Sequence, residues 1–151
     1  MLAQVSTQFM SAFNTLPNTL LYLAVGLLLT AAFLFIYEVL TPLREMEEVR
    51  DGNAAVAYAF GGALIGFALP LVVLIRYSAS VTELVVWGVL IIAIQYAAYW
   101  VAMLLYSPLH WIQGGRQMVV DLSRGQTSTG IYVASVVIVV GAFNAACLVP
   151  A

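Results

Sequence analysis

Four long apolar runs, separated by short polar segments, form the hydrophobic pattern of this chain. They cover residues 19–40, 54–75, 83–106 and 128–150. Each run has at least 22 residues, and a helix that rises about 1.5 Å per residue needs about 20 residues to cross a hydrocarbon core of roughly 30 Å. The pattern therefore predicts an all-α membrane protein, with four transmembrane helices in one domain that spans residues 1–151.

Proline and threonine residues mark the expected helix boundaries. Pro17 and Asn18 precede the first run, so we expect the first helix to begin at Thr19. Thr41 suits an N-cap and Pro42 suits a first helical position. They predict a short amphipathic helix on the membrane surface, whose apolar side chains recur at a spacing of three: Leu43, Met46 and Val49.

The two later connections differ in length. The segment from Tyr77 to Thr82 is only long enough for a hairpin between two helices. The segment from Ser107 to Thr127 is expected to be a longer loop with a break at Gly114–Gly115.

The two halves of the chain resemble each other. Ala31–Ala32 matches Ala97–Ala98, Thr41–Pro42–Leu43 matches Ser107–Pro108–Leu109, and Gly52–Asn53 matches Gly125–Gln126. This similarity predicts two tandem helical hairpins over about residues 19–78 and 83–150. Because both copies begin on the same side of the membrane, we expect a parallel repeat rather than an inverted one.

Arginine positions predict the orientation in the membrane. The loops after the first and third runs carry arginines, namely Arg44, Arg50, Arg116 and Arg124, whereas the opposite side has Arg76. The positive-inside rule therefore places both longer loops in the cytoplasm and both termini in the periplasm.

Composition excludes several classes of function. The chain is 64% hydrophobic and 8% charged, with a mean hydropathy of +1.03, whereas a soluble domain carries about 25% charged residues. It contains no lysine, so nucleic-acid binding has no electrostatic footprint. His110 and Cys147 are each the only residue of their type, which leaves no metal-ligand spacing, and no catalytic or cofactor motif occurs. We therefore expect a protein that is not an enzyme and binds no cofactor.

Three features of the sequence together resemble a known family. The first is the pair of tandem two-helix units. The other two are the segments DGNAAVAYAFGGALIGFALPL, which starts at Asp51, and GAFNAACL, which starts at Gly141. They are similar to the YjfL-like family of small bacterial inner-membrane proteins, a two-copy domain of unknown function. The resemblance covers nearly the whole chain from about Thr19. It implies four helices in the inner membrane and an association with envelope stress, including peripheral membrane-binding partners, and it supplies no catalytic residues.

A stripe of small residues runs along the second apolar run, at Ala55, Ala59, Gly62 and Gly66. Small residues let two membrane helices approach closely, where packing replaces the hydrophobic drive that water supplies. The stripe therefore predicts either helix packing inside one subunit or the interface of a homo-oligomer.

Polar residues inside the predicted helices are a second group of candidates. Glu38, Gln95 and Asn144 lie within apolar runs, and Pro70 predicts a kink. A polar residue within the membrane suggests a functional site. The alternatives are that Glu38 reaches the interface to pair with Arg44 or Arg50, and that the amides of Gln95 and Asn144 bond each other.

Acidic residues gather in the first cytoplasmic loop, at Glu45, Glu47, Glu48 and Asp51. This cluster is either a solvated turn or a face that binds a basic partner. We therefore expect a homo-oligomeric scaffold or anchor in the lipid bilayer for a peripheral membrane-stress protein. The alternative is a subunit of an oligomeric ion channel or small-solute transporter.

Overall fold

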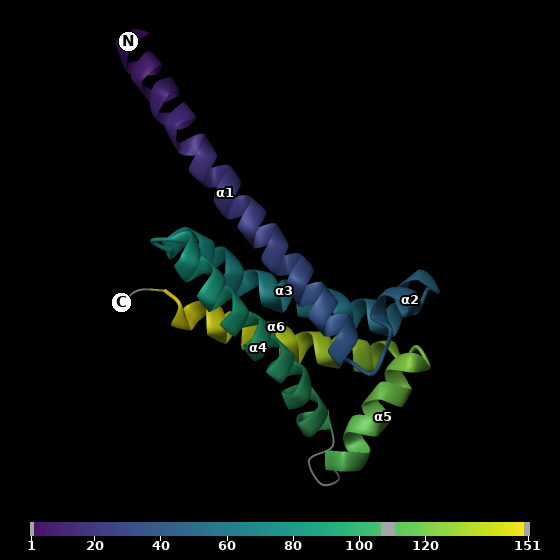
Figure 1. The fold of residues 1–151 in the computed structure, drawn as a ribbon. Coiled ribbons are helices and arrows are strands. Elements are labelled where there is room, and N and C mark those ends of the chain that lie inside the picture. The colour runs from purple at the N-terminus through teal and green to yellow at the C-terminus, as the bar shows by residue number, and fades with distance from the viewer. Residues whose placement is uncertain (1, 107–110, 150–151) are drawn as a thin grey trace.

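The fold is entirely helical in a computed structural model that describes residues 2–106 and 111–149, with side chains for 15–106 and 115–149. The helices follow one another as drawn in Figure 1: α1 (Leu2–Leu40), α2 (Glu45–Arg50), α3 (Ala54–Tyr77), α4 (Val81–Tyr106), α5 (Trp111–Ser123) and α6 (Thr127–Cys147).

Four of these helices are long and apolar enough to cross a membrane, which confirms the predicted number of spans. The candidate spans are Thr15–Leu40, Ala54–Tyr77, Val81–Tyr106 and Thr127–Cys147. The described part of the chain is therefore all-helical, with four candidate membrane spans.

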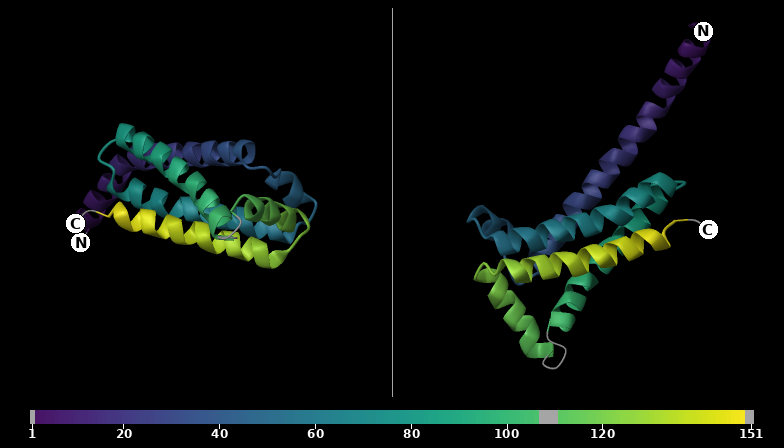
Figure 2. Two further views of the ribbon diagram at one scale, coloured as in Figure 1. Left: turned by 90° about the horizontal axis from the view of Figure 1, so that it is seen from below. Right: turned by 180° about the vertical axis from the view of Figure 1, so that it is seen from behind.

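The helices run in two directions. α3 and α6 lie side by side and run the same way, while α1 and α4 cross them and run back (Figures 1 and 2). α2 and α5 both lie at the end where α3 and α6 begin, which we call the short-helix end. The turn between α3 and α4 lies at the opposite end, which we call the hairpin end. The N-terminal half of α1 extends away from the other helices.

Small residues bring the backbones of α3 and α6 together. A Cβ atom built on Gly130 would meet the Ala55 carbonyl, and one built on Gly141 would meet the Gly66 carbonyl. A Cβ on Gly62 would likewise meet the backbone of Ala134. Because no side chain fits at these three crossings, glycine sets the separation of the two helices.

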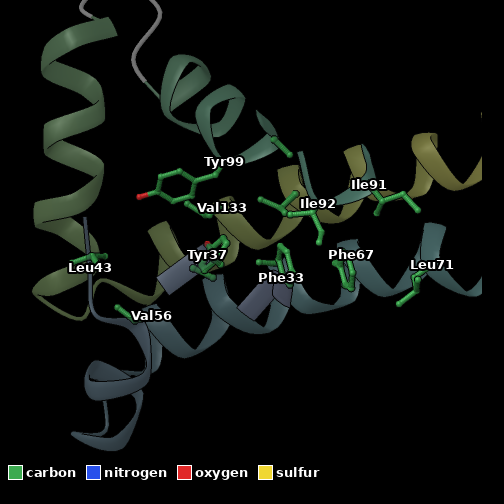
Figure 3. Packing of buried hydrophobic residues seen from close by; sticks show 14 of the residues in the cluster. Phe33, Tyr37, Leu43, Val56, Phe67, Leu71, Ile91, Ile92, Tyr99 and Val133 are labelled. Atoms are coloured by element: carbon green, nitrogen blue, oxygen red, sulfur yellow. The ribbon is translucent and has the colours of Figure 1, made fainter. Parts of the chain in front are cut away.

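Aromatic rings fill the contact between α1 and this pair. The rings of Phe33 and Phe67 stack with centroids 4.4 Å apart, and Tyr37 meets the edge of Tyr99 at 6.1 Å. All four side chains are buried, and they form a row across α1, α3 and α4 (Figure 3). Because offset and edge-to-face rings gain energy beyond their buried area, this row fixes the place where α1 crosses α3.

The predicted start of the first helix is wrong. α1 continues through Pro17 as one helix from Leu2 to Leu40. A proline removes one backbone hydrogen bond, and membrane helices tolerate that loss more readily than the sequence rule assumes. At about 1.5 Å per residue, this helix is roughly 58 Å long, which exceeds the thickness of a bilayer core.

Two connections also differ from expectation. The segment expected as a loop with a break at Gly114–Gly115 contains α5, which passes through both glycines. Gly115 is buried, and its Cβ position lies 3.2 Å from Met103 Cε, so this glycine allows α5 to approach α4. α2 begins at Glu45 rather than Pro42, because the Thr41 hydroxyl donates to the Tyr37 carbonyl at 2.7 Å and closes α1 instead.

Candidate functional site

The short-helix end contains most of the polar contacts between helices. Asn53 is the N-cap of α3, and its side-chain oxygen accepts from the Val56 N–H at 3.2 Å. Its amide nitrogen donates to Glu48 at 2.8 Å and to the Leu122 carbonyl at 2.9 Å. One side chain therefore joins α2, α3 and the end of α5.

A second polar group joins α4, α5 and α6. The Tyr106 hydroxyl donates to Asp121 at 2.8 Å and lies 3.2 Å from the Thr129 hydroxyl. Gln117 donates to the other oxygen of the Asp121 carboxylate at 2.8 Å. Asp121 is buried, so its carboxylate is compensated by these hydrogen bonds, and the bond from Tyr106 holds α5 against the end of α4.

Glu45 does not belong to an exposed acidic face, contrary to the sequence prediction. Its side chain is 3% exposed, and it lies near Thr41, Tyr37 and Tyr99. Burial raises the pKa of Glu45 to about 7, against a usual value of 4.5. The spacing of apolar residues in α2 did not predict this burial, because Met46 is 53% exposed and Glu45 is the residue of α2 that is buried.

The other acidic residues of this segment lie at or near the surface. Glu47 is exposed and pairs with Arg44 at 3.2 Å, while Asp51 is exposed. Glu48 is half-buried and accepts the bond from Asn53. The predicted acidic cluster is thus divided into one buried residue, one residue that supports Asn53, and two surface residues.

Glu38 makes a different contact from the predicted arginine pair. Its carboxylate accepts the backbone N–H of Met46 at 3.3 Å. Met46 lies in the first turn of α2, where backbone N–H groups have no partner within the helix. Glu38 therefore supports the start of α2 from the end of α1.

The small-residue stripe lies within the subunit. Ala55, Ala59, Gly62 and Gly66 are all buried, and Gly62 and Gly66 face α6. This is the intrasubunit alternative stated for the stripe, so α6 occupies the face that a second subunit would need.

Gln95 and Asn144 do not bond each other. The Gln95 amide donates to the Val137 carbonyl at 3.2 Å, and it lies beside Gly66. The buried Nδ2 of Asn144 has no hydrogen-bond partner among the described residues. Pro70 is buried within α3, which runs unbroken from Ala54 to Tyr77.

Four buried polar side-chain atoms lack a hydrogen-bond partner in the described part of the chain. They are Glu45 Oε2, Tyr99 Oη, Gln95 Oε1 and Asn144 Nδ2. Tyr99 and Gln95 are four residues apart on one face of α4, and both are buried there. A buried polar group without a hydrogen-bond partner costs stability in an apolar medium. The presence of these four atoms therefore indicates a role other than packing, such as contact with a ligand or water.

A pocket of about 450 Å³ opens between α4, α5 and the link from α1 to α2. We call it the α4–α5 pocket. Its walls are mainly apolar and include Leu40, Trp100 and Val119, while Tyr99 and Arg116 contribute polar groups. The hydrophobic pattern did not predict this pocket, because the segment that forms its α5 wall was expected to be a loop.

No group of three or more histidine, cysteine, aspartate or glutamate side chains that could hold a metal ion occurs among the described residues. His110 lies outside the described residues.

Comparison with known proteins identifies similar chains. The profile of the DUF350 family, described as Domain of Unknown Function, matches residues 10–148. The UPF0719 inner membrane protein YjfL of Escherichia coli (strain K12) is 28% identical over 127 residues, which cover 84% of this chain and 89% of that protein. The UPF0719 transmembrane protein YshE of Bacillus subtilis (strain 168) is 34% identical over 76 residues, 50% of this chain and 57% of that protein. No solved structure matches the chain.

Proposed function

The chain belongs to the DUF350 family, and from this premise we propose that it is a non-enzymatic inner-membrane anchor whose short-helix end binds a peripheral partner in the cytoplasm. The Escherichia coli relative YjfL is an inner membrane protein, which supports the inner-membrane location. The resemblance to proteins associated with envelope stress suggests a membrane-stress protein as that partner.

The observation that carries this proposal is the bonded construction of the short-helix end. Asn53 links α2, α3 and α5, and the Tyr106 hydroxyl of α4 links Asp121 of α5 to Thr129 of α6. A connection that only turns the chain needs no such bonds. A binding surface benefits from them, because side chains held in place lose less entropy when a partner docks.

Exposed charges on α2 would meet the partner. Glu47 and Asp51 are exposed beside each other at the outer edge of this end. Charges at the rim of an interface steer association and make it sensitive to salt. A partner with a basic surface fits this edge, and the arginine distribution supports a cytoplasmic position for it.

Two structural expectations belong to the same proposal. The proposed duplication is supported by matching turns, since Gly52 and Gly125 both have positive φ angles, of 87° and 76°, and each precedes an amide residue at the N-cap of a long helix. The proposed homo-oligomer would use the outer face of α1, because the small-residue stripe of α3 is covered by α6.

Charge reversal tests the anchor function. In Glu47→Lys/Asp51→Lys, the exposed rim becomes basic while Glu48 and its bond to Asn53 remain. Cross-linking in living cells, followed by purification from membranes, should recover fewer copies of the partner with this variant than with the unchanged protein. Ala79→Lys, which adds an exposed charge at the hairpin end, should recover as much as the unchanged protein. Equal recovery from all three proteins would contradict the anchor function.

The unpartnered polar atoms favour a second candidate, a pathway for protons or small ions. Tyr99 and Gln95 share one face of α4. Gln95 bonds to Val137 of α6, and Asn144 lies about two turns further along α6. Hydrogen-bonding groups in such a row could conduct with transient water. Purified protein in vesicles tests this: a proton or potassium flux that Gln95→Leu abolishes would support conduction, and vesicles no leakier than empty ones would count against it.

A further inference from the structure

The α4–α5 pocket has charges of opposite sign at its two ends. Arg116 lies at the rim and is exposed. Tyr99 and Thr41 line the inner part, and both lie close to the buried carboxyl group of Glu45. The pocket is therefore positive where it opens, and a partly ionised carboxyl group lies beside its inner part.

The inner part also contains a polar group with no partner. The Tyr99 side chain is 3% exposed, and its hydroxyl has no hydrogen-bond partner among the described residues. In Figure 3 the Tyr99 ring projects from α4 toward α5, with its oxygen at the far end. The neighbouring Glu45 Oε2 is also buried without a partner. Both oxygens can accept hydrogen bonds, so a ligand that brings N–H donors would satisfy them.

The walls of the pocket match the apolar part of a lipid. Trp100 and Leu40 are about half exposed, at 51% and 49%, and they lie at the end of the spans α4 and α1. A pocket of about 450 Å³ falls within the range of roughly 300–1,000 Å³ that small-molecule sites occupy. A headgroup could enter it while the acyl chains remain along Trp100 and Leu40.

We propose that the α4–α5 pocket binds a phospholipid with a phosphoethanolamine headgroup, its phosphate at Arg116 and its ammonium at the Tyr99 hydroxyl. The guanidinium of Arg116 suits a phosphate oxygen. The ammonium has three N–H donors, and the ionised form of Glu45 attracts it. A phosphocholine headgroup has the same charges but no N–H donor, and a phosphoglycerol headgroup has no cation, so both leave the inner oxygens unsatisfied.

Native mass spectrometry of the purified full chain tests the headgroup preference. The protein is mixed with equal amounts of phosphatidylethanolamine, phosphatidylcholine and phosphatidylglycerol of identical acyl chains. The first bound lipid should be phosphatidylethanolamine by about tenfold over the other two, which corresponds to one charge-assisted hydrogen bond. Arg116→Gln and Glu45→Gln should each reduce this ratio toward one. Arg124→Gln and Glu47→Gln are matched controls at exposed sites outside the pocket, and they should keep it.

Fluorescence quenching locates the bound lipid. Trp87→Phe/Trp111→Phe leaves Trp100 as the single tryptophan. Phosphatidylethanolamine with brominated chains should quench Trp100 more strongly than brominated phosphatidylcholine at the same mole fraction in vesicles, and Arg116→Gln should remove the difference. Equal binding of the three lipids, preference for phosphatidylglycerol, or a phosphatidylethanolamine preference that survives Arg116→Gln would overturn the proposal. Because the exposed Arg116 holds no helix in place, that variant keeps the test valid even if Glu45→Gln fails to fold.

Discussion

Glu45 is enclosed by side chains from the spans, whereas Glu47, two residues further along α2, points into solvent. Desolvation is the main cause that raises the pKa of Glu45, and the nearby Glu38 adds to it, while the polar groups of Thr41 and of the Glu45 backbone act in the opposite direction. Tyr37 of α1 and Tyr99 of α4 also face this carboxyl group. Near neutral pH, Glu45 is therefore divided between its charged and neutral forms.

Stability should fall as the pH rises through the range in which Glu45 ionises. A carboxyl group whose pKa is higher in the folded protein than in the unfolded chain holds its proton more tightly when folded. Its stabilising contribution is complete below the unfolded value of 4.5 and is lost as the pH rises through about 7. At about pH 8, Glu45→Gln should therefore have a free energy of unfolding roughly 1–3 kcal/mol above that of the unchanged protein, and it should unfold at a higher temperature. At about pH 5, the two proteins should unfold at nearly the same temperature.

Thermal unfolding in detergent micelles at the two pH values measures this difference. Glu47→Gln is the control, because Glu47 is exposed, and its difference from the unchanged protein should not vary with pH. A difference for Glu45→Gln that is the same at both pH values would show that its carboxyl group does not titrate in this range.

Individual side chains could be predicted from the sequence only where the membrane dictates their surroundings. Gln95 and Asn144 were recognised as intramembrane amides because both lie within long apolar runs. Their partners depend on how α4 and α6 rotate about their axes, which hydropathy does not reveal. Asn53 was missed as a junction, because its partner Leu122 carbonyl is 69 residues away in the chain.

At the scale of the elements, the contact between α3 and α6 depends on four glycines. Gly130 and Gly141 of α6 meet carbonyl groups of α3, and Gly62 and Gly66 of α3 meet the backbones of Ala134 and Val137. A backbone atom cannot move aside as a flexible side chain can. The separation of α3 and α6 should therefore be sensitive to a single methyl group.

Gly141→Ala should destabilise the protein by about 1–3 kcal/mol, because its Cβ would collide with the Gly66 carbonyl. Gly61→Ala is the matched control, since no atom lies within 4 Å of that Cβ position and alanine favours the helix. Thermal unfolding and resistance to proteolysis in detergent measure both variants. If the two behave alike, close packing of α3 and α6 does not limit stability.

The sequence predicted the long helices better than the short ones. Long apolar runs indicate a span whatever its neighbours are, so all four were found within a few residues except at Pro17. α5 was not predicted, because its two glycines suggested a break in the chain. In the structure they lie inside the helix, and Gly115 lets α5 pack against Met103 of α4. The α4–α5 pocket was missed with it, because a pocket wall cannot be inferred where no helix is expected.

At the scale of the whole molecule, the helices are arranged around α3 and α6, with α1 and α4 crossing them (Figure 2). The apolar runs gave the number of spans but not this arrangement, because in lipid all four helices are apolar on every side and the pattern does not say which faces meet. The orientation of the molecule in the membrane stays a prediction from arginine positions.

Cysteine labelling should place the two ends of the molecule on opposite sides of the membrane. In a Cys147→Ser background, Ser80→Cys lies in the exposed turn at the hairpin end and Asp51→Cys lies at the short-helix end. A membrane-impermeant maleimide should label Ser80→Cys in intact spheroplasts and Asp51→Cys only after lysis. In the unchanged protein, the natural Cys147 is exposed and should be labelled in intact spheroplasts, as Ser80→Cys is. The reverse pattern would invert the proposed orientation.

The pairing of α3 with α6 has a consequence for biosynthesis. The ribosome completes α3 at Tyr77 about 70 residues before it completes α6 at Cys147, which at 5–20 residues per second takes roughly 4 to 14 s. Throughout that interval the glycine face of α3 lacks α6 beside it, and for about the first 45 residues, from Tyr77 to Leu122, the amide of Asn53 also lacks its Leu122 acceptor. A nascent chain that stalls or is truncated before α6 would therefore remain inserted but incomplete, and would be a substrate for membrane chaperones and proteases.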